Sequence, residues 1–102
     1  MPDMLSLVAH LRAKPGMEQE LVRTMTALVG PSREEEGCID YHLHQSNDDP
    51  AAIVVYENWR EMADLEKHFE EPYLKAFFAR KDELVEGEID IKFYTMLSDR
   101  DG

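Results

Sequence analysis

Hydrophobic and polar residues alternate at the start of the chain. Between positions 4 and 11 every second residue is apolar, namely Leu5, Leu7, Ala9 and Leu11. A period of two is typical of a β-strand that buries one face. The turn-forming sequence Lys14-Pro15-Gly16 follows. The pattern therefore predicts a first strand over residues 4–11.

The period then changes to that of a helix. Between Met17 and Val29 the apolar residues fall on one helical face, which predicts an amphipathic helix. Gly30-Pro31 is expected to end or kink it, because proline has no backbone N–H. Ser32 could then cap a short helical turn, and Gly37 suits the left-handed residue that closes such a turn.

Two further runs predict a β-hairpin. Cys38–Gln45 alternates in polarity, and Ala52–Trp59 is rich in β-branched and aromatic residues. The residues between them, 46–50, are turn formers, and a short loop between two such runs favours antiparallel pairing.

Helical spacing returns over residues 62–69. Pro72 is expected to interrupt it and to start a second helix, which runs to about residue 84 before Gly87 ends it. Alternation over residues 89–94 predicts a last strand. Residues 98–102 are predicted to form a loose tail.

The order of elements is therefore β-α-β-β-α-β within a single domain over residues 1–102, with a core from about 4 to 97. This order predicts an α+β, ferredoxin-like antiparallel sheet with helices on one face. The other face is left open, and an open, partly apolar face favours a homodimer closed face to face as a barrel. The open face is expected to carry Val8, His10, Val54, Tyr56, Tyr94 and Met96.

Composition limits the partners. The net charge of −11 argues against nucleic acid and against an anionic membrane surface, since both attract clustered Lys and Arg. The sequence has neither a long apolar run nor a signal-like start, so we expect a cytoplasmic protein. Its one cysteine, Cys38, is interpreted as a buried, unreactive thiol.

Three groups of residues resemble a known family. They are Lys14-Pro15-Gly16 before an amphipathic helix, Glu36-Gly37-Cys38 at the start of a strand that contains Tyr41, and the series Tyr56-Glu57-Asn58-Trp59, Leu65, His68, Pro72 and Phe77. Their order and spacing resemble the antibiotic-biosynthesis monooxygenase family and its quinol monooxygenase-like members. In that family a histidine stands nine residues after the Trp of a Glu-x-Trp strand end, as His68 does here.

The resemblance implies a dimeric α+β barrel. It also implies a monooxygenase that uses O2 to oxidise a small aromatic quinol or anthrone-like substrate without metal, flavin or another cofactor. Fold resemblance alone does not fix the chemistry, since related proteins degrade haem, isomerise a metabolite or have no assigned reaction. A non-catalytic small-molecule-binding or stress-associated dimer and an acid–base isomerase therefore remain alternatives.

The resemblance makes His68 the candidate catalytic residue, whose ordinary pKa suits proton transfer at neutral pH. Its alternative is a helix-edge histidine that bonds a carbonyl. The candidate substrate-binding residues are Trp59, Asn58, Tyr73, Tyr41 and Phe77. Trp59 is equally interpretable as a core residue, and strand alternation should turn Asn58 to the opposite side. Tyr73 replaces a second histidine found in many family members, which weakens the case for a two-histidine isomerase.

Two other groups have simpler explanations. His42 and His44 share a strand face, but Asp40 is the only further ligand in their row, so a solvated face is favoured over a metal site. The acidic run Glu34-Glu35-Glu36 is interpreted as a solvated turn.

Overall fold

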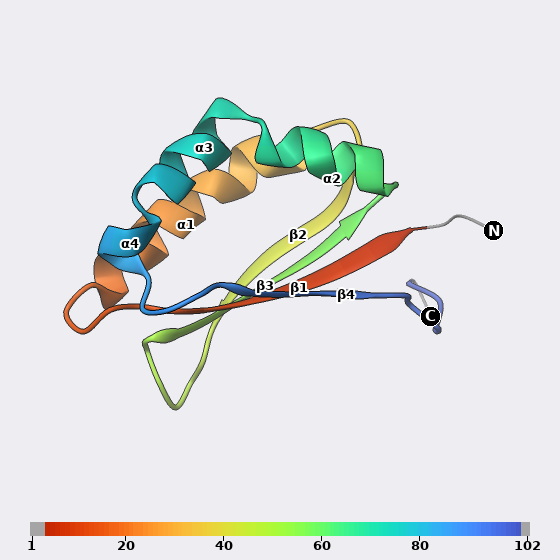
Figure 1. The fold of residues 1–102 in the computed structure, drawn as a ribbon. Helices are drawn as coiled ribbons and strands as arrows, with labels where there is room; N and C mark the ends of the chain where they lie inside the picture. The colour runs from red at the N-terminus through yellow and green to blue at the C-terminus, as the bar shows by residue number, and fades with distance from the viewer. Residues whose placement is uncertain (1–3, 101–102) are drawn as a thin grey trace.

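The computed structural model describes residues 4–100. The elements are β1 (Leu5–Arg12), α1 (Glu18–Arg33), β2 (Cys38–Gln45), β3 (Ala52–Trp59), α2 (Met62–Phe69), α3 (Pro72–Ala79), α4 (Lys81–Leu84) and β4 (Asp90–Tyr94). The helices lie on one side of the sheet, and none of the described helices covers the other side (Figure 1). The predicted α+β order and ferredoxin-like class are confirmed.

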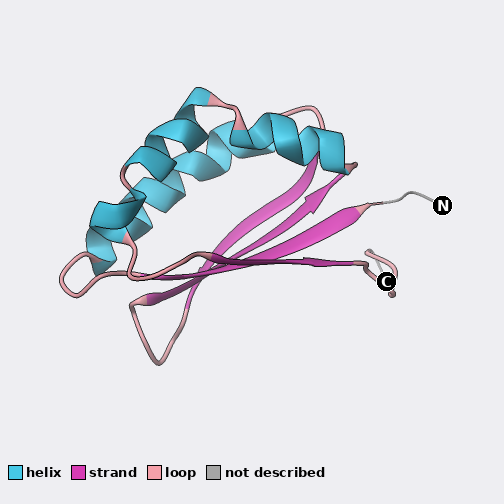
Figure 2. Ribbon diagram, in the orientation of Figure 1, coloured by secondary structure: helices cyan, strands magenta, loops and turns pink. Residues whose placement is uncertain are grey.

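The four strands of the sheet are antiparallel, in the order β2-β3-β1-β4. The register places Val8 opposite Tyr56 on one side and opposite Lys92 on the other. His10 lies opposite Val54. The expected open-face residues of these strands therefore share one face, because side chains alternate along a strand. Figure 2 shows that no helix covers this face.

The core lies between the other face of the sheet and the helices. On β1 and β3 it takes the residues of opposite parity, Leu7, Ala9 and Leu11 with Ile53, Val55 and Trp59. The helices contribute buried apolar residues from each segment: Leu21, Met25, Leu28, Leu65, Leu74, Phe77 and Leu84. The apolar residues of the strands and those of the helices therefore pack together in one core between the sheet and the helices.

Gly30-Pro31 was expected to end or kink the first helix, and the expected end is wrong, as is the expected cap at Ser32, which lies inside the last turn of α1. Pro31 lies inside α1, which continues to Arg33. Proline lacks its own N–H, but its fixed φ is compatible with helix, and its carbonyl still accepts the Glu34 N–H at 3.2 Å. The helix therefore carries the chain one turn further before β2 begins.

The prediction of a left-handed Gly37 is also wrong. Among residues 4–100, the glycines with positive φ are Gly16 and Gly87. Gly37 is instead needed for lack of space, because a Cβ built on it would lie 2.1 Å from Cγ of Asp64. The chain before β2 consequently packs directly against α2.

The second helical region is split at Pro72 as predicted, and it breaks again at Arg80 before α4. The described part of the predicted loose tail is held to the sheet. Arg100 donates from Nε and Nη2 to the Asp40 carboxylate at 2.6 and 2.7 Å. Residues 101 and 102 lie outside the described part of the chain.

Candidate active site

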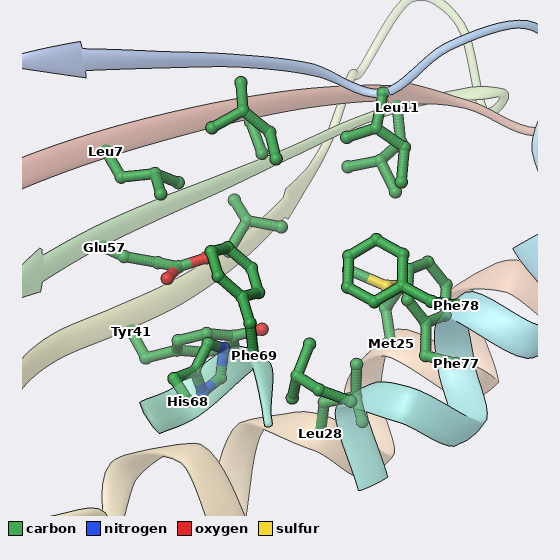
Figure 3. A pocket seen from close by; sticks show the side chains of 15 residues that line it. Leu7, Leu11, Met25, Leu28, Tyr41, Glu57, His68, Phe69, Phe77 and Phe78 are labelled. Atoms are coloured by element: carbon green, nitrogen blue, oxygen red, sulfur yellow. The ribbon is translucent and has the colours of Figure 1, made fainter. Parts of the chain in front are cut away.

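A small cavity lies between the sheet and the helices (Figure 3). The space open to water-sized molecules is about 40 Å³, enough for roughly three waters. Its lining is almost entirely apolar, with Glu57, His68 and the hydroxyl of Tyr41 as the polar exceptions. The lining residues are Leu7, Ala9, Leu11, Met25, Leu28, Tyr41, Val55, Glu57, His68, Phe69, Leu74, Phe77, Phe78, Ile89 and Ile91.

The cavity has a polar end and an apolar end. Figure 3 shows Glu57, Tyr41 and His68 at one end and Met25, Phe77 and Phe78 at the other. Phe78 is 39% exposed although it lines the cavity, so the apolar end approaches the surface there. The polar groups are therefore farthest from the residue that meets solvent.

His68 is held by contacts on several sides. It is 1% exposed, and its ring centroid lies 4.6 Å from that of Trp59 and 5.8 Å from that of Tyr41. Its Nδ1 lies 2.7 Å from Oε2 of Glu35. A carboxylate accepts the Nδ1 proton, which leaves Nε2 of the neutral ring as a proton acceptor. Burial lowers the pKa of His68 below its usual range, and the Glu35 carboxylate opposes that shift.

Glu35 is a site residue that the sequence interpretation placed wrongly. Its side chain is 11% exposed rather than solvated, and it joins His68 to Tyr73, whose hydroxyl donates to the same Oε2. The Tyr73 hydroxyl also lies 3.3 Å from the carbonyl of Pro31. Burial and the Glu35 carboxylate raise the pKa of Tyr73, so its hydroxyl stays protonated and donates.

Local structure explains how Glu35 reaches α2. The continuation of α1 to Arg33 leaves only a short turn before β2. Gly37 lets that turn lie against Asp64, and its carbonyl accepts the Arg60 N–H at 2.8 Å. Arg60 also forms a two-bond pair with Asp64 at 2.9 and 3.0 Å. No local pattern in the sequence marks Glu35, because its partners are 33 and 38 residues away.

Glu57 is a second residue that sequence reasoning missed. It is 6% exposed, and it lies on β3 between Leu7 of β1 and Tyr41 of β2. Its Oε1 accepts the indole N–H of Trp59 at 2.8 Å. Burial raises the pKa of Glu57 to about 7, with a further contribution from the charge of Glu35 and against the Trp59 hydrogen bond. The sequence did contain a signal, because Glu57 stands at one of the alternate positions of β3 that face the core, and the other residues at those positions are apolar.

The predicted site residues fall into three groups. His68, Tyr41 and Phe77 line the cavity. Trp59 and Tyr73 lie behind it, one against the His68 ring and the other on Glu35.

Asn58 is turned to the open face, where its side chain bonds Ser6, Asp40 and Tyr56. Strand alternation keeps it from the cavity that Glu57 and Trp59 face.

Other candidate chemistry is weak. Within residues 4–100 there is no group of three His, Cys, Asp or Glu side chains placed to hold a metal, and His42 and His44 are exposed on the open face. Cys38 is half-buried, and burial raises its pKa to about 11, which agrees with an unreactive thiol. In the same stretch no helix has the length and apolarity to cross a membrane.

Comparison with known proteins identifies the family to which the chain belongs. The antibiotic biosynthesis monooxygenase family matches residues 4–80. The chain belongs to that family, and the resemblance found in its motifs is confirmed.

Individual relatives agree with this assignment. The chain is 29% identical over 96 residues to the Escherichia coli protein named "Probable quinol monooxygenase YgiN", covering 84% of this chain and 88% of that one. The crystal structure of PA3566 from Pseudomonas aeruginosa has a TM-score of 0.91 at 35% identity, over 96% of this chain and 98% of that chain. Protein sll1783 of Synechocystis sp. is 28% identical over 90% of this chain, which spans 63% of that relative's length.

Proposed function

We propose that this protein is a monooxygenase that uses O2 to oxidise a small aromatic quinol or anthrone-like molecule, without metal or flavin. The observation that carries the proposal is the cavity, which is apolar except at one end, where His68 and Glu57 lie. A mostly apolar pocket with a few convergent polar groups and shifted pKa values is the usual form of a small-molecule active site. Family membership and the name given to the Escherichia coli relative support the same reaction class.

The lining restricts the substrate. None of the described residues that line the cavity is Lys or Arg, so the site favours a neutral ring over a carboxylated or phosphorylated one. The free volume of about 40 Å³ is well below the roughly 300 Å³ typical of ligand pockets. An aromatic substrate therefore enters by displacing Phe78, the exposed side chain at the apolar end, and places its hydroxyl toward His68.

His68 begins the reaction as a base. Neutral His68 takes the phenolic proton at Nε2 while Glu35 holds Nδ1–H. The imidazolium that forms is stabilised by that carboxylate. The product of the step is an electron-rich phenolate in a cavity with little water.

The phenolate then reacts with O2 directly. One electron passes to O2, and the substrate radical and superoxide combine to form a C–O bond at a ring carbon. The peroxide takes back the proton held by His68. Loss of the proton on that carbon then breaks the O–O bond, so that one oxygen stays as a carbonyl and the other leaves as water.

We also propose that the working form is a homodimer closed through the open sheet face. The face carries half-buried Val8, Val54 and Tyr56 with 49%-exposed Tyr94, and the described helices leave it uncovered. A patch of this kind favours a second copy of the sheet. Light scattering of the purified protein should give twice the chain mass, and a stable monomer at micromolar concentration would contradict it.

The reaction is tested by oxygen uptake with a panel of quinols and anthrones, followed by mass spectrometry after reaction under oxygen-18. One labelled atom should enter the product. We expect His68→Ala to lower the rate by roughly 100-fold or more. Lys67→Ala, which removes an exposed side chain from α2 next to His68 and away from the open face, is the control and should keep the wild-type rate.

Two results would contradict the proposal. One is the absence of oxygen uptake above background with every substrate. The other is a product that forms equally well without oxygen, which would favour an isomerase on the same fold.

A further inference from the structure

We infer that Glu57 is the second proton-transfer residue of this cavity: it removes the proton from the oxygenated ring carbon and passes it to the departing oxygen. The inference rests on the proposed function and assigns a step that His68 does not perform. It is carried by the position and the unsatisfied oxygen of this one buried side chain.

The geometry of Glu57 points its carboxyl into the cavity. Glu57 and Trp59 share the inward face of β3, and the indole N–H occupies Oε1 at 2.8 Å. Oε2 has no hydrogen-bond partner among residues 4–100. The residue is 6% exposed and lines the cavity, so that free oxygen faces the space a substrate would fill (Figure 3).

A purely structural role does not account for this carboxyl. Burying an ionisable group is costly unless it is paired, and Glu57 has no cation beside it in the described structure. A glutamine would accept the Trp59 N–H equally well without titrating. The titratable groups that interact electrostatically with Glu57 are Tyr41 and Cys38 of β2 and Glu35 of the preceding turn, and His68 of α2 lines the same cavity; none is a permanent positive charge.

The cavity separates two proton carriers. Neutral His68 handles the hydroxyl proton and returns it to the peroxide, as described above. The remaining proton is the one on carbon. Glu57 takes it as a carboxylate, the C–H electron pair becomes the second bond of the new carbonyl, and the O–O bond breaks. The protonated Glu57 gives its proton to the leaving hydroxide as water, so both residues end in their starting states.

The pKa of Glu57 suits a group that must both accept and donate a proton. Burial raises its pKa to about 7, so the acid and the carboxylate are both populated near neutral pH. Below that pH the carboxylate is scarce and carbon deprotonation should slow. The His68 pKa is shifted in the opposite direction, below its ordinary range, so the two groups lose their base forms at different pH values.

The experiment compares wild type with Glu57→Gln, using a substrate that carries deuterium on the oxygenated carbon. We expect product formation by the variant to fall about 100-fold. Its deuterium isotope effect should exceed that of wild type, and the loss of rate on acidification near pH 7 should disappear. Glu57→Asp, which keeps a carboxylate, should recover part of the rate, and Glu66→Gln on the exposed face of α2 should match wild type.

A Glu57→Gln protein with the wild-type rate, isotope effect and pH profile overturns the inference and leaves the proposed function intact. A wild-type protein that takes up no oxygen overturns both. Should Glu57→Gln fold poorly, wild type alone still decides: a rate independent of pH between about 6 and 8 contradicts a role for a group that titrates there.

Discussion

The pKa of a carboxyl group is shifted in opposite directions on the two faces of the sheet. Glu57 on the covered face is buried among apolar residues, and its pKa is raised to about 7. Asp40 on the open face accepts hydrogen bonds from Arg100 and Asn58, and its pKa is lowered to about 2, first by the Arg100 hydrogen bond. Both carboxylates sit on neighbouring strands, and only the parity of their positions separates them.

The contrast shows what the helices add to the sheet. On the open face a carboxylate keeps an arginine partner and stays ionised at any physiological pH. Under the helices, burial raises the pKa of Glu57 by more than its hydrogen bond with Trp59 lowers it, and burial also lowers the pKa of His68. The covered face therefore raises the pKa of Glu57 toward neutral pH and lowers that of His68 from its ordinary value, so that near neutral pH both residues have a base form that can accept a proton.

The largest expected effect is on pH-dependent stability. The folded-state pKa of Glu57 is raised from 4.5 to about 7, so its favourable contribution is complete below pH 4.5 and is lost as the pH rises through 7. Relative to wild type, Glu57→Gln should gain about 3 kcal/mol of unfolding free energy between about pH 4 and pH 9. Urea unfolding at several pH values measures the difference in unfolding free energy between the variant and wild type. If that difference does not change with pH, the pKa of Glu57 is not raised in the folded protein.

The packing that places Glu35 should be nearly as sensitive. Gly37→Ala puts a Cβ into the Asp64 side chain, which must move together with its Arg60 partner. We expect a loss of about 2 kcal/mol from overpacking, measured by thermal or urea unfolding. Gly30→Ala is the matched control, since a Cβ at Gly30 meets no atom within 4 Å. Equal stability of the two variants would show that the turn is not held by this contact.

Glu35→Gln tests how one carboxylate of the covered face acts on the other titratable groups. The Glu35 carboxylate raises the pKa values of both His68 and Glu57, so its removal should lower both and let their base forms persist to more acid pH. The weaker, less firmly oriented base should reduce the oxygenation rate roughly tenfold. The pH profile of the rate measures both effects. The control is Glu34→Gln, which changes an exposed residue one position earlier. If the pH at which the rate falls on acidification is the same in Glu35→Gln as in wild type, Glu35 has no role in the reaction.

The smallest effect belongs to the open face. The folded-state pKa of Asp40 is lowered, so its contribution to stability is present above pH 3.8 and is lost as the pH falls toward 2. Asp40→Asn should cost at most about 1 kcal/mol at neutral pH, because the ion pair with Arg100 is partly exposed to solvent. Provided that light scattering shows the variant to be a dimer like wild type, its oxygenation rate should equal that of wild type. A large loss of rate would mean that the two faces are not independent.

The sequence predicted the fold well because the fold depends on local periodicity. Alternation located the strands, Pro72 marked the break between α2 and α3, and the inward parity of β3 followed from Ile53 and Val55. Pro31 misled because a proline near a helix end removes one hydrogen bond without ending the helix.

The site was predicted less completely because it depends on contacts between distant segments. His68, Tyr41 and Phe77 line the cavity, and their catalytic and substrate-binding roles stay predictions. Glu35 depends on a turn that packs against α2, which no spacing rule reveals. Glu57 carried a signal in the sequence, because it is an acidic residue at a position of β3 where the alternate residues are apolar. The signal indicates a site only once that face of the sheet is known to be covered by helices.

Whether Glu57 is a second proton carrier is tested most directly by titrating the side chains themselves by carbon-13 NMR, with wild type compared to Glu57→Gln for assignment. We expect a glutamate carboxyl signal that titrates near pH 7 and is absent from the variant, and a His68 ring that titrates below 6.5. A Glu57 carboxyl that titrates near its ordinary 4.5 would contradict it, since the covered face would then hold no second proton carrier.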